Sequence, residues 1–262
     1  MIPAALLAAA LLSATASPQR NPLTGTWVAD LDSQQGLPTD VYLIRDGTYS
    51  CESCAPPRNY PADGRLRPVA SSPAVAEAAT IVDSRTLSTR IVQPDLTRTT
   101  TMRIARDGQT ATYVSIDRRV GIQGTLRTEY LARRTASGPA GSHAASGTWQ
   151  GIRYVSVQVQ LRTTVLIDGG DQLSYRSGTG FSYTASFGEE FVPISGPYDG
   201  SISVSVRRLD PYRLVETRRR GSDNIQVRTY TVARDGRSME IATTNLASNT
   251  TFRVTARRRG PP

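Results

Sequence analysis

The sequence predicts an all-β protein built from two tandem antiparallel up-and-down β-barrel-like domains, with about eight strands each. Three observations predict this class: apolar and polar residues alternate along many short runs, Asp-Gly pairs separate the runs, and one unit of sequence occurs twice. Alternation with a period of two puts the apolar side chains on one face of a strand. Strands joined by hairpins can close into a barrel, which removes exposed sheet edges. A pair of open, strongly curved sheets is the alternative.

The internal repeat sets the expected domain organisation. The recurring motifs are Gly25-Thr26-Trp27 with Gly147-Thr148-Trp149, Ala105-Arg106-Asp107-Gly108 with Ala233-Arg234-Asp235-Gly236, and Ala132-Arg133-Arg134 with Ala256-Arg257-Arg258. They keep the same order at similar spacing, as a duplicated unit requires. We therefore expect a first β-domain over residues 21–134, a linker of small residues over 135–146 and a second β-domain over 147–259.

The alternating runs predict the strands one by one. In the first copy they lie near 25–30, 40–45, 48–52, 78–83, 86–93, 97–105, 110–117 and 124–133. In the second copy they lie near 147–154, 157–167, 171–177, 182–187, 201–208, 212–219, 225–233, 237–244 and 250–256. Residues 74–79 are the best candidate for a helix, and a short one. Asp-Gly pairs begin at Asp46, Asp107, Asp168 and Asp235, and favour hairpins in which both turn residues have positive φ.

The first 16 residues predict a signal peptide. The apolar run from Ile2 to Leu12 is shorter than the roughly 20 residues that span a bilayer, and Ala14-Thr15-Ala16 fits a cleavage site. The segment before the run has no arginine or lysine, and a buried first helix is the alternative. We expect a periplasmic or secreted protein that does not span the membrane and is a monomer.

Cys51 and Cys54 are the two cysteines of the chain. An oxidising compartment favours a local disulfide between them. A redox-active pair and half of a metal site are the alternatives. No second pair of ligands is available to complete a metal site, so we expect no bound metal and no cofactor.

The Gly-x-Trp motif that opens each copy resembles the first-strand motif of lipocalins. The resemblance implies that Trp27 and Trp149 are structural anchors at the closed end of each barrel, with an arginine from the last strand packed across the indole. Candidates for that arginine are Arg127 and Arg133 in the first copy, and Arg253 and Arg257 in the second. A clear C-terminal helix, which lipocalins carry, is missing. A plain core role for the two tryptophans is the alternative.

A second resemblance covers most of the chain after the signal peptide. Its motifs are Gly25-Thr26-Trp27, Cys51-Glu-Ser-Cys-Ala-Pro-Pro57, Pro61-Ala-Asp-Gly64, Ala105-Arg-Asp-Gly-Gln-Thr110 and Gly138-Pro-Ala-Gly-Ser-His143. Together they resemble exported bacterial proteins of unknown function that carry a duplicated Gly-x-Trp β-domain. The resemblance implies the architecture and no activity. The second copy lacks the cysteine pair, so a role of those cysteines would belong to the first copy alone.

The composition excludes several kinds of catalysis. All 31 basic residues are arginine, so a Schiff-base lysine and a phosphate-binding P-loop are both absent. The one histidine, His143, lies in the expected linker, where little packing would hold it for catalysis. The adjacent carboxylates of Glu189 and Glu190 would point to opposite faces of a strand. Glu77 and Asp83 could form a catalytic pair, but no sequence motif indicates it. We expect no catalytic residues, with a carboxylate-dependent hydrolase as the enzymatic alternative.

The arginines also suggest a binding surface. The chain up to residue 134 has 15 arginines against 12 acidic residues, and the second copy has 16 against 10. One run of arginines, 218–220, is expected at a hairpin end and the other, 257–259, in the terminal tail. Aromatic residues are only 6% of the chain, which disfavours nucleic acid as a partner. An anionic envelope component is a better candidate for this surface.

The preferred functional hypothesis is a non-enzymatic protein that binds a small, partly apolar ligand. A barrel either fills its interior with side chains or holds one ligand, in the barrel mouth or in a groove between the copies. The candidate lining residues are Tyr42, Tyr113, Tyr175, Phe181, Tyr183, Phe187 and Phe191. An envelope interaction module using an arginine-rich face is the second alternative.

Overall fold

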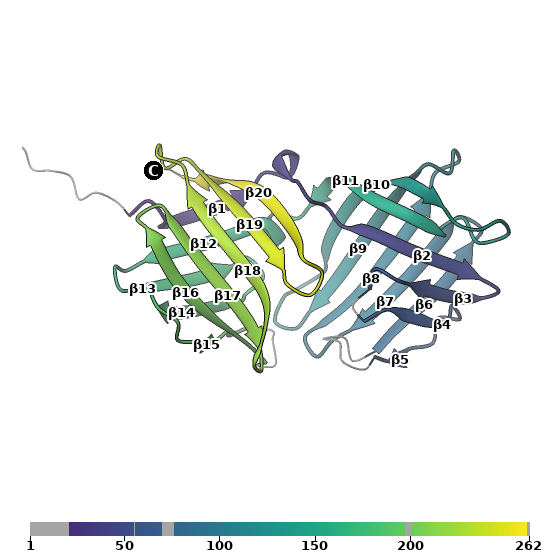
Figure 1. The fold of residues 1–262 in the computed structure, drawn as a ribbon, viewed down its shortest axis with the longest axis horizontal. Helices are drawn as coiled ribbons and strands as arrows, with labels where there is room; N and C mark the ends of the chain where they lie inside the picture. The colour runs from purple at the N-terminus through teal and green to yellow at the C-terminus, as the bar shows by residue number, and fades with distance from the viewer. Residues whose placement is uncertain (1–20, 55, 70–75, 197–200, 261–262) are drawn as a thin grey trace, which may run out of the picture.

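The chain folds into two barrel-like units that lie side by side along the long axis of the molecule (Figure 1). The structure is a computed structural model and describes residues 21–54, 56–69, 76–196 and 201–260. Each unit is a ten-stranded antiparallel sheet; one curls into a nearly closed barrel and the other into a half-barrel. The all-β class and the tandem barrel-like arrangement are therefore confirmed. The predicted signal peptide lies outside the described residues.

We name the sheet that holds most of the first copy the first barrel, and the other sheet the second barrel. The strands of the first barrel are β2 (Thr39–Arg45), β3 (Thr48–Cys51), β4 (Arg58–Pro61), β5 (Arg67–Pro68), β6 (Ala76–Asp83), β7 (Thr86–Val92), β8 (Leu96–Ile104), β9 (Thr110–Arg119), β10 (Leu126–Ser137) and β11 (Gly147–Val157). Those of the second barrel are β1 (Gly25–Ala29), β12 (Thr163–Asp168), β13 (Gln172–Ser177), β14 (Ser182–Ser186), β15 (Val192–Pro193), β16 (Ile202–Asp210), β17 (Arg213–Arg220), β18 (Asp223–Val232), β19 (Ser238–Asn245) and β20 (Thr250–Arg259). Neighbours in the sheets follow chain order, as in a meander, except at β1 and β11.

The two copies exchange their first strands. β1 lies between β12 and β20 of the second barrel, and β11 lies between β2 and β10 of the first. In Figure 1 the purple β1 accordingly lies among the green and yellow strands of the C-terminal half. The chain passes between the barrels through 3-10 helix η1 (Leu31–Ser33) after β1, and through η2 (Val159–Arg162) after β11. The predicted domains follow the sequence repeat, but β1 and β11 each belong to the sheet formed mostly by the other copy.

Each sheet has ten strands rather than about eight because short edge strands escaped prediction. β4, β5 and β15 each end in a proline, and each lies at an end of its sheet. Proline cannot donate to the ladder and is tolerated at edges, where it also discourages pairing with another chain. Strands of two to four residues carry too little alternation to be recognised.

Three local predictions were wrong. Of the helix expected over 74–79, residues 74 and 75 lie outside the described residues, whereas residues 76–79 begin β6, with Ala78 and Ala79 buried. The strand expected over 157–167 is interrupted, because β11 ends at Val157 and η2 follows. The stretch predicted as a linker begins as strand, since β10 continues to Ser137.

The Asp-Gly turns are of two kinds. Asp46 and Gly47 both have positive φ, as expected for a two-residue hairpin. At the turns after β8 and after β18 only Gly108 and Gly236 have positive φ, and at the turn after β12 the glycine is Gly170. These loops are longer than two residues, so a single glycine closes them.

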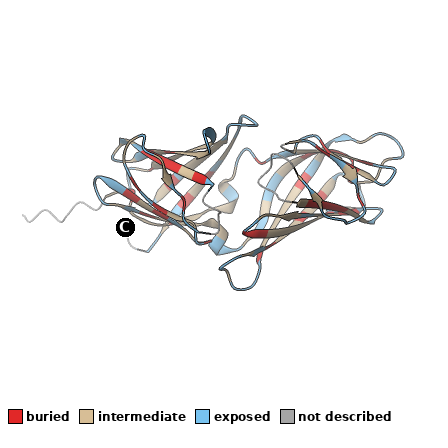
Figure 2. Cartoon of the chain, turned by 90° about the horizontal axis from the view of Figure 1, so that it is seen from below, coloured by how far each residue is buried: buried red, intermediate tan, exposed pale blue. Residues whose placement is uncertain are grey.

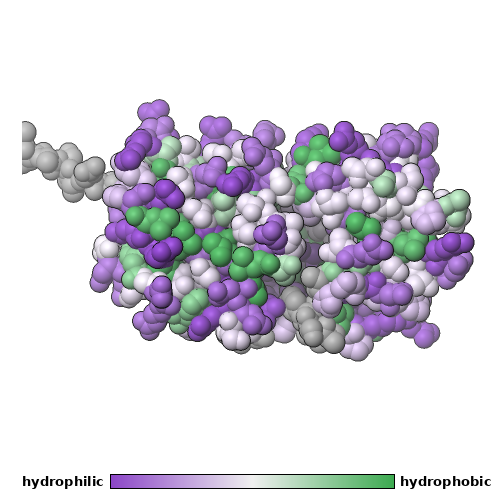
Figure 3. All heavy atoms as spheres, in the orientation of Figure 1, coloured by the Kyte–Doolittle hydropathy of each residue, from purple (hydrophilic) through white to green (hydrophobic). Residues whose placement is uncertain are grey.

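Each barrel has its own hydrophobic core. Figure 2 shows the buried residues on the strands, and mostly exposed residues in the loops. Because of the strand exchange, Trp27 is buried in the core of the second barrel, and Trp149 in the core of the first. Both tryptophans are 0% exposed. On the face drawn in Figure 3, polar side chains dominate and apolar ones form separate small patches.

Candidate ligand-binding site

One end of each barrel is closed by a tryptophan and an arginine. The guanidinium of Arg258 lies 4.3 Å from the ring centre of Trp27, and that of Arg134 lies 4.4 Å from Trp149. Each indole N–H donates to the carbonyl four residues earlier, at 3.1 Å for Trp27 and 2.9 Å for Trp149. An arginine over a desolvated indole face is a favourable cation–π contact.

The predicted arginine partners of the two tryptophans were wrong. Arg133 and Arg257 precede the true partners by one residue, and adjacent residues of a strand point to opposite faces. Arg257 pairs instead with Asp30 on the outside. Arg127 and Arg253 pair with the carboxylates Glu129 and Glu240, two further surface contacts. The run at 257–259, expected in the terminal tail, is the end of strand β20.

The same arginines bind the backbone that leads into the exchanged strand. Arg134 donates to the carbonyls of Ser146 at 3.0 Å and Ala144 at 2.5 Å. Arg258 donates to Thr24 and, at 2.5 Å, to Pro22, which are the equivalent positions of the first copy. The amino groups of both arginines thus bind backbone carbonyls, whereas Nε of Arg134 is buried without a hydrogen-bond partner among the described residues.

The second barrel contains a cavity of about 450 Å³ on the side that faces the first barrel. It extends along β19 and β20 toward their turn, and its wall also includes Thr164, which pairs with Trp27. Half of its lining residues are apolar or aromatic and half are polar or charged, and three of them come from β10 and β11 of the first barrel. The lining residues are Ala29, Leu31, Gln34, Thr128, Tyr154, Val157, Leu161, Arg162, Thr163, Thr164, Tyr175, Ser177, Thr179, Phe181, Arg218, Arg228, Ile241, Thr243, Phe252 and Val254.

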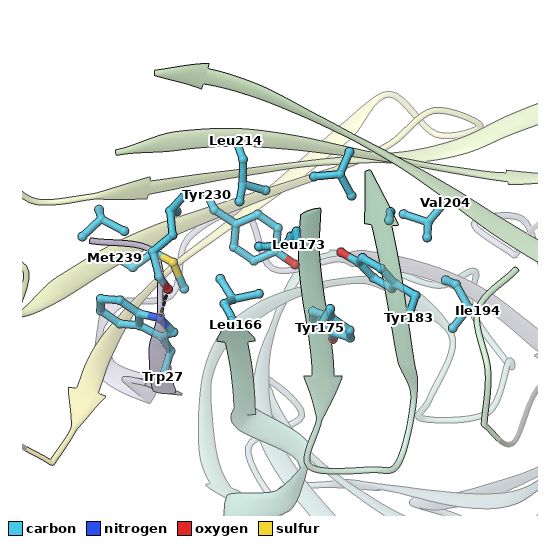
Figure 4. Packing of buried hydrophobic residues seen from close by; sticks show 14 of the residues in the cluster. Trp27, Leu166, Leu173, Tyr175, Tyr183, Ile194, Val204, Leu214, Tyr230 and Met239 are labelled. Atoms are coloured by element: carbon cyan, nitrogen blue, oxygen red, sulfur yellow. Dashed lines mark hydrogen bonds between the residues drawn. The ribbon is translucent and has the colours of Figure 1, made fainter. Parts of the chain in front are cut away.

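A buried carboxylate lies behind this cavity. Glu216 is 0% exposed and accepts hydrogen bonds from the hydroxyls of Tyr183 at 2.7 Å and Tyr230 at 3.0 Å. Arg218 donates to its other oxygen at 2.5 Å, and Arg228 lies 3.8 Å from that oxygen. Figure 4 shows Tyr183 and Tyr230 inside the barrel, apart from Trp27, whose dashed bond reaches the Leu23 carbonyl.

The charges at this site do not cancel. Burial by itself would raise the pKa of Glu216, but the nearby charges of Arg218 and Arg228 outweigh it and lower the pKa to about 2. Glu216 is therefore ionised and neutralises one of the two arginines. The second arginine has no carboxylate of its own among the contacts that the structure shows here.

Two further polar atoms in the cavity wall lack hydrogen-bond partners. They are Nε of Arg162 and Oε1 of Gln34, both buried and without a partner among the described residues. Buried polar atoms normally find a protein or water partner. The wall thus offers one guanidinium in excess and two polar atoms without partners, together with apolar and aromatic side chains.

The predicted lining residues fall into three groups. Tyr175 and Phe181 line the second-barrel cavity, whereas Tyr42 and Tyr113 line a smaller cavity of about 250 Å³ in the first barrel. Tyr183 is buried in the core with its hydroxyl on Glu216. Phe187 and Phe191 each pack against an arginine. The guanidinium of Arg208 lies 4.1 Å from the ring centre of Phe187, and that of Arg219 lies 3.8 Å from the ring centre of Phe191.

Sequence reasoning missed Glu216, Arg218 and Arg228. The run at 218–220 was correctly placed at a hairpin end, because β17 ends at residue 220, but Arg218 points into the barrel rather than to the surface. The available signal was strand alternation, which places Glu216 and Arg218 on the same face as the buried Leu214.

The cysteines and the histidine have structural surroundings. Cys51 and Cys54 lie at disulfide distance, 2.03 Å between the sulfur atoms, and Cys54 lines the first-barrel cavity. His143 is held in place, contrary to the expected loose linker: Nε2 contacts the Asp83 carbonyl at 2.6 Å and Nδ1 accepts from the Ala145 amide at 3.1 Å. Both ring nitrogens are thus engaged by the backbone.

The carboxylates proposed for hydrolysis do not converge. Glu77 and Asp83 lie six residues apart on β6, which separates them by roughly 20 Å along the strand. Both oxygens of Glu77 accept from Arg58, at 2.6 and 2.9 Å. Glu189 and Glu190 are exposed.

The described residues hold no group of three or more His, Cys, Asp or Glu side chains that could bind a metal ion. Within the same part of the chain, no helix has the length and apolar character needed to cross a membrane. Comparison with protein-family models, with curated proteins and with solved structures finds no match.

Proposed function

We propose that this protein binds a small, partly apolar anion in the second-barrel cavity. The observation that supports the proposal most is the pair Arg218 and Arg228 beside a single buried carboxylate, Glu216. An excess guanidinium in a partly desolvated site binds carboxylate, sulfonate or phosphate groups strongly. The proposed N-terminal signal peptide would place this activity in the periplasm or outside the cell.

The rest of the lining suits an apolar body attached to the anionic group. Phe252, Ile241 and Val254 contribute apolar surface on one side, and Tyr175 with Phe181 contributes aromatic surface on the other. Ligand sites of this size are mostly apolar with a few polar groups that orient the ligand. Arg228, with Nε on Thr243 at 3.2 Å and one amino group on the Tyr230 hydroxyl at 3.2 Å, is held in one orientation.

The test uses 8-anilinonaphthalene-1-sulfonate as a fluorescent probe and octanoate as its competitor. Wild type should enhance the fluorescence of the probe saturably, and octanoate should reverse the enhancement. Arg228→Met removes the excess charge and leaves the Glu216–Arg218 pair intact, so affinity for the probe should fall at least about tenfold. Arg213→Met, on the exposed side of β17, is the matched control and should bind as wild type.

Ile241→Trp is a second variant that fills the cavity from β19 without touching the charges. It should also abolish binding, with an unchanged circular dichroism spectrum. If folded Arg228→Met and Ile241→Trp proteins both bound the probe as wild type does, the proposed site would be wrong.

An anionic surface partner is the second candidate function. Arg85, Arg103 and Arg106 are exposed around a hollow of about 460 Å³ at the turn that contains Asp83. Exposed arginines attract phosphate or sulfate groups in a salt-dependent way. Wild type should bind a heparin column at low salt and elute at moderate salt, and the triple change of these arginines to Gln should abolish the retention. If wild type passes the column at low salt without retention, the anionic surface partner is excluded.

A further inference from the structure

The first barrel contains a second cavity, with a different chemistry. It has a volume of about 250 Å³ and its wall is rich in tyrosine. Tyr113 and Tyr130 stack with ring centres 4.5 Å apart. The ring centre of Tyr49 lies 5.9 Å from that of Tyr42 and 5.4 Å from that of Tyr60, so these three rings form a second aromatic group in the same wall.

Asp40 is the carboxylate in this cavity that has no arginine partner among the contacts the structure shows. The hydroxyl of Tyr130 donates to its Oδ2 at 3.4 Å. The other acidic lining residue, Glu77, is matched by Arg58. Asp40 is partly buried on β2 and directed at the same space as the tyrosines.

Two arginines line the cavity, and neither compensates Asp40 by direct contact. Arg98 is held by both oxygens of Asp117, at 2.6 and 2.7 Å. Arg90 comes from β7 and is exposed at the rim, where water screens its charge.

A buried hydroxyl in the same wall also lacks a partner. Tyr113 is 2% exposed, and its hydroxyl lies near that of Tyr42 without a well-formed hydrogen bond to any described residue. Such a group normally bonds to protein or to ordered water. Its position in the wall, beside Tyr130, indicates that the cavity is polar enough to receive a hydrogen-bonding ligand or water.

The second barrel shows that Asp40 is not required by the fold. In the first barrel Asp40 pairs with Trp149, and in the second barrel the residue that pairs with Trp27 in the same way is Thr164. The next inward position is Tyr42 in the first barrel and Leu166 in the second. The frame therefore tolerates an uncharged residue at this position, and the acid with its tyrosine neighbour is a special feature of the first barrel.

We propose that the first-barrel cavity binds a small organic cation, with its charged group between the tyrosine rings and the carboxylate of Asp40. Aromatic faces attract cations, and quaternary ammonium groups in particular are bound by cages of such rings. A carboxylate at the side of the cage adds direct charge complementarity. The site is separate from the second-barrel cavity and does not depend on the function proposed for it.

The pH dependence of binding follows from Asp40. Burial raises the pKa of Asp40 to about 6, against hydrogen bonds from Tyr130 and Tyr42 that lower it. Burial also raises the pKa of Tyr42, Tyr113 and Tyr130, so these hydroxyls stay protonated near neutral pH. The remaining charged groups of the wall are the Arg98–Asp117 and Arg58–Glu77 pairs and the exposed Arg90. Affinity for a cation should thus increase as pH rises through about 6 and then level off.

Calorimetric titration with choline and with its neutral isostere 3,3-dimethylbutan-1-ol tests the proposal. Wild type at pH 8 should bind choline at least about tenfold more tightly than the alcohol. Asp40→Asn should reduce choline affinity by a similar factor and abolish its dependence on pH. Asp46→Asn, the same change at an exposed turn at the end of the same strand, should leave affinity unchanged.

Arg90→Gln separates electrostatic recognition from a purely hydrophobic pocket. Loss of this rim cation should strengthen choline binding about twofold and leave alcohol binding unchanged. The proposal is overturned if wild type does not bind choline at millimolar concentration, if choline and the alcohol bind equally well, or if folded Asp40→Asn binds choline as wild type does.

Discussion

Glu216 is the residue on which the polar interior of the second barrel depends. It accepts from two tyrosine hydroxyls and balances a guanidinium, all within a core that is otherwise apolar. Removing one member of a buried ion pair leaves the other without compensation. The residue therefore has a structural role even though it lies beside the proposed anion site.

Substitution of Glu216 by Gln should destabilise the protein by about 3–5 kcal/mol, because Arg218 and Arg228 would then both be buried without a counter-charge. Urea unfolding at pH 7 measures the loss. Glu240→Gln, which removes an exposed carboxylate paired with Arg253, is the control and should cost much less. Equal losses in the two variants would contradict the proposed role of Glu216.

The same carboxylate predicts a contribution to acid unfolding. The folded pKa of Glu216, about 2, lies below the ordinary value of 4.5, so ionised Glu216 stabilises the fold at pH values above 4.5. This stabilisation should decrease as pH falls from about 4.5 toward 2. The difference in free energy of unfolding between wild type and Glu216→Gln should therefore decrease over that range. A difference that stays constant from pH 7 to 2 would contradict the lowered pKa of Glu216.

Arg258 and Arg257 test the assignment of strand faces. Arg258→Met removes the contact with Trp27 and hydrogen bonds to several carbonyls, and should lower stability by about 1–3 kcal/mol. Arg257→Met removes an exposed ion pair with Asp30 and should have a smaller effect. Thermal unfolding of both variants gives the comparison; a larger effect at Arg257 would reverse the assignment.

At the scale of elements, the main feature is the exchange of β1 and β11 between the barrels. Each strand brings a buried tryptophan into the opposite core, and each is held there by an arginine of the adjacent strand. Neither half of the sequence thus contains all strands of one sheet. The exchange couples the two barrels through covalent connections at η1 and η2.

Hydrogen exchange measured by mass spectrometry can detect this coupling. Leu214→Ala makes a cavity in the second barrel and should cost about 2–5 kcal/mol. Exchange in β1 should then accelerate together with β17 to β20, while β2 remains protected. Ile44→Ala in the first barrel is the reciprocal variant and should expose β11 together with β2. Protection of β1 that follows the first barrel instead would contradict the exchange.

Much of the strand pattern could be predicted from the sequence, but its pairing could not. Long alternating segments such as 201–206 revealed their strands directly, because Ile202, Val204 and Val206 form one apolar face. The proline-containing edge strands β4 and β15 were too short to show a period. The exchange is invisible to this reasoning, because Gly-Thr-Trp opens both copies and either sheet accepts it.

The candidate sites could be predicted only in part, for the same physical reason. Tyrosines such as Tyr42 and Tyr175 were identified by residue type, and both line cavities. Charged residues were interpreted as surface groups by residue type, although alternation places Asp40 on the same strand face as the buried Ile44, and Arg228 on the same face as the buried Tyr230. Asp40 and Arg228 are the two most important examples.

At the scale of the whole molecule, one duplicated frame carries two cavities of opposite character. The first-barrel cavity contains the carboxylate of Asp40 among tyrosines, whereas the second-barrel cavity contains the excess guanidinium of Arg218 and Arg228 among apolar residues. The tryptophan–arginine closures of the two barrels are nearly identical. The two barrels therefore share the tryptophan–arginine contact and differ in the charged groups of their cavities.

This arrangement predicts that the two cavities are occupied independently. Native mass spectrometry of the wild-type protein with choline and octanoate present together tests this central claim most directly. We predict a ternary complex carrying one molecule of each ligand, with Asp40→Asn losing only choline and Arg228→Met losing only octanoate. Mutually exclusive adducts, or loss of both ligands in either folded variant, would contradict the claim.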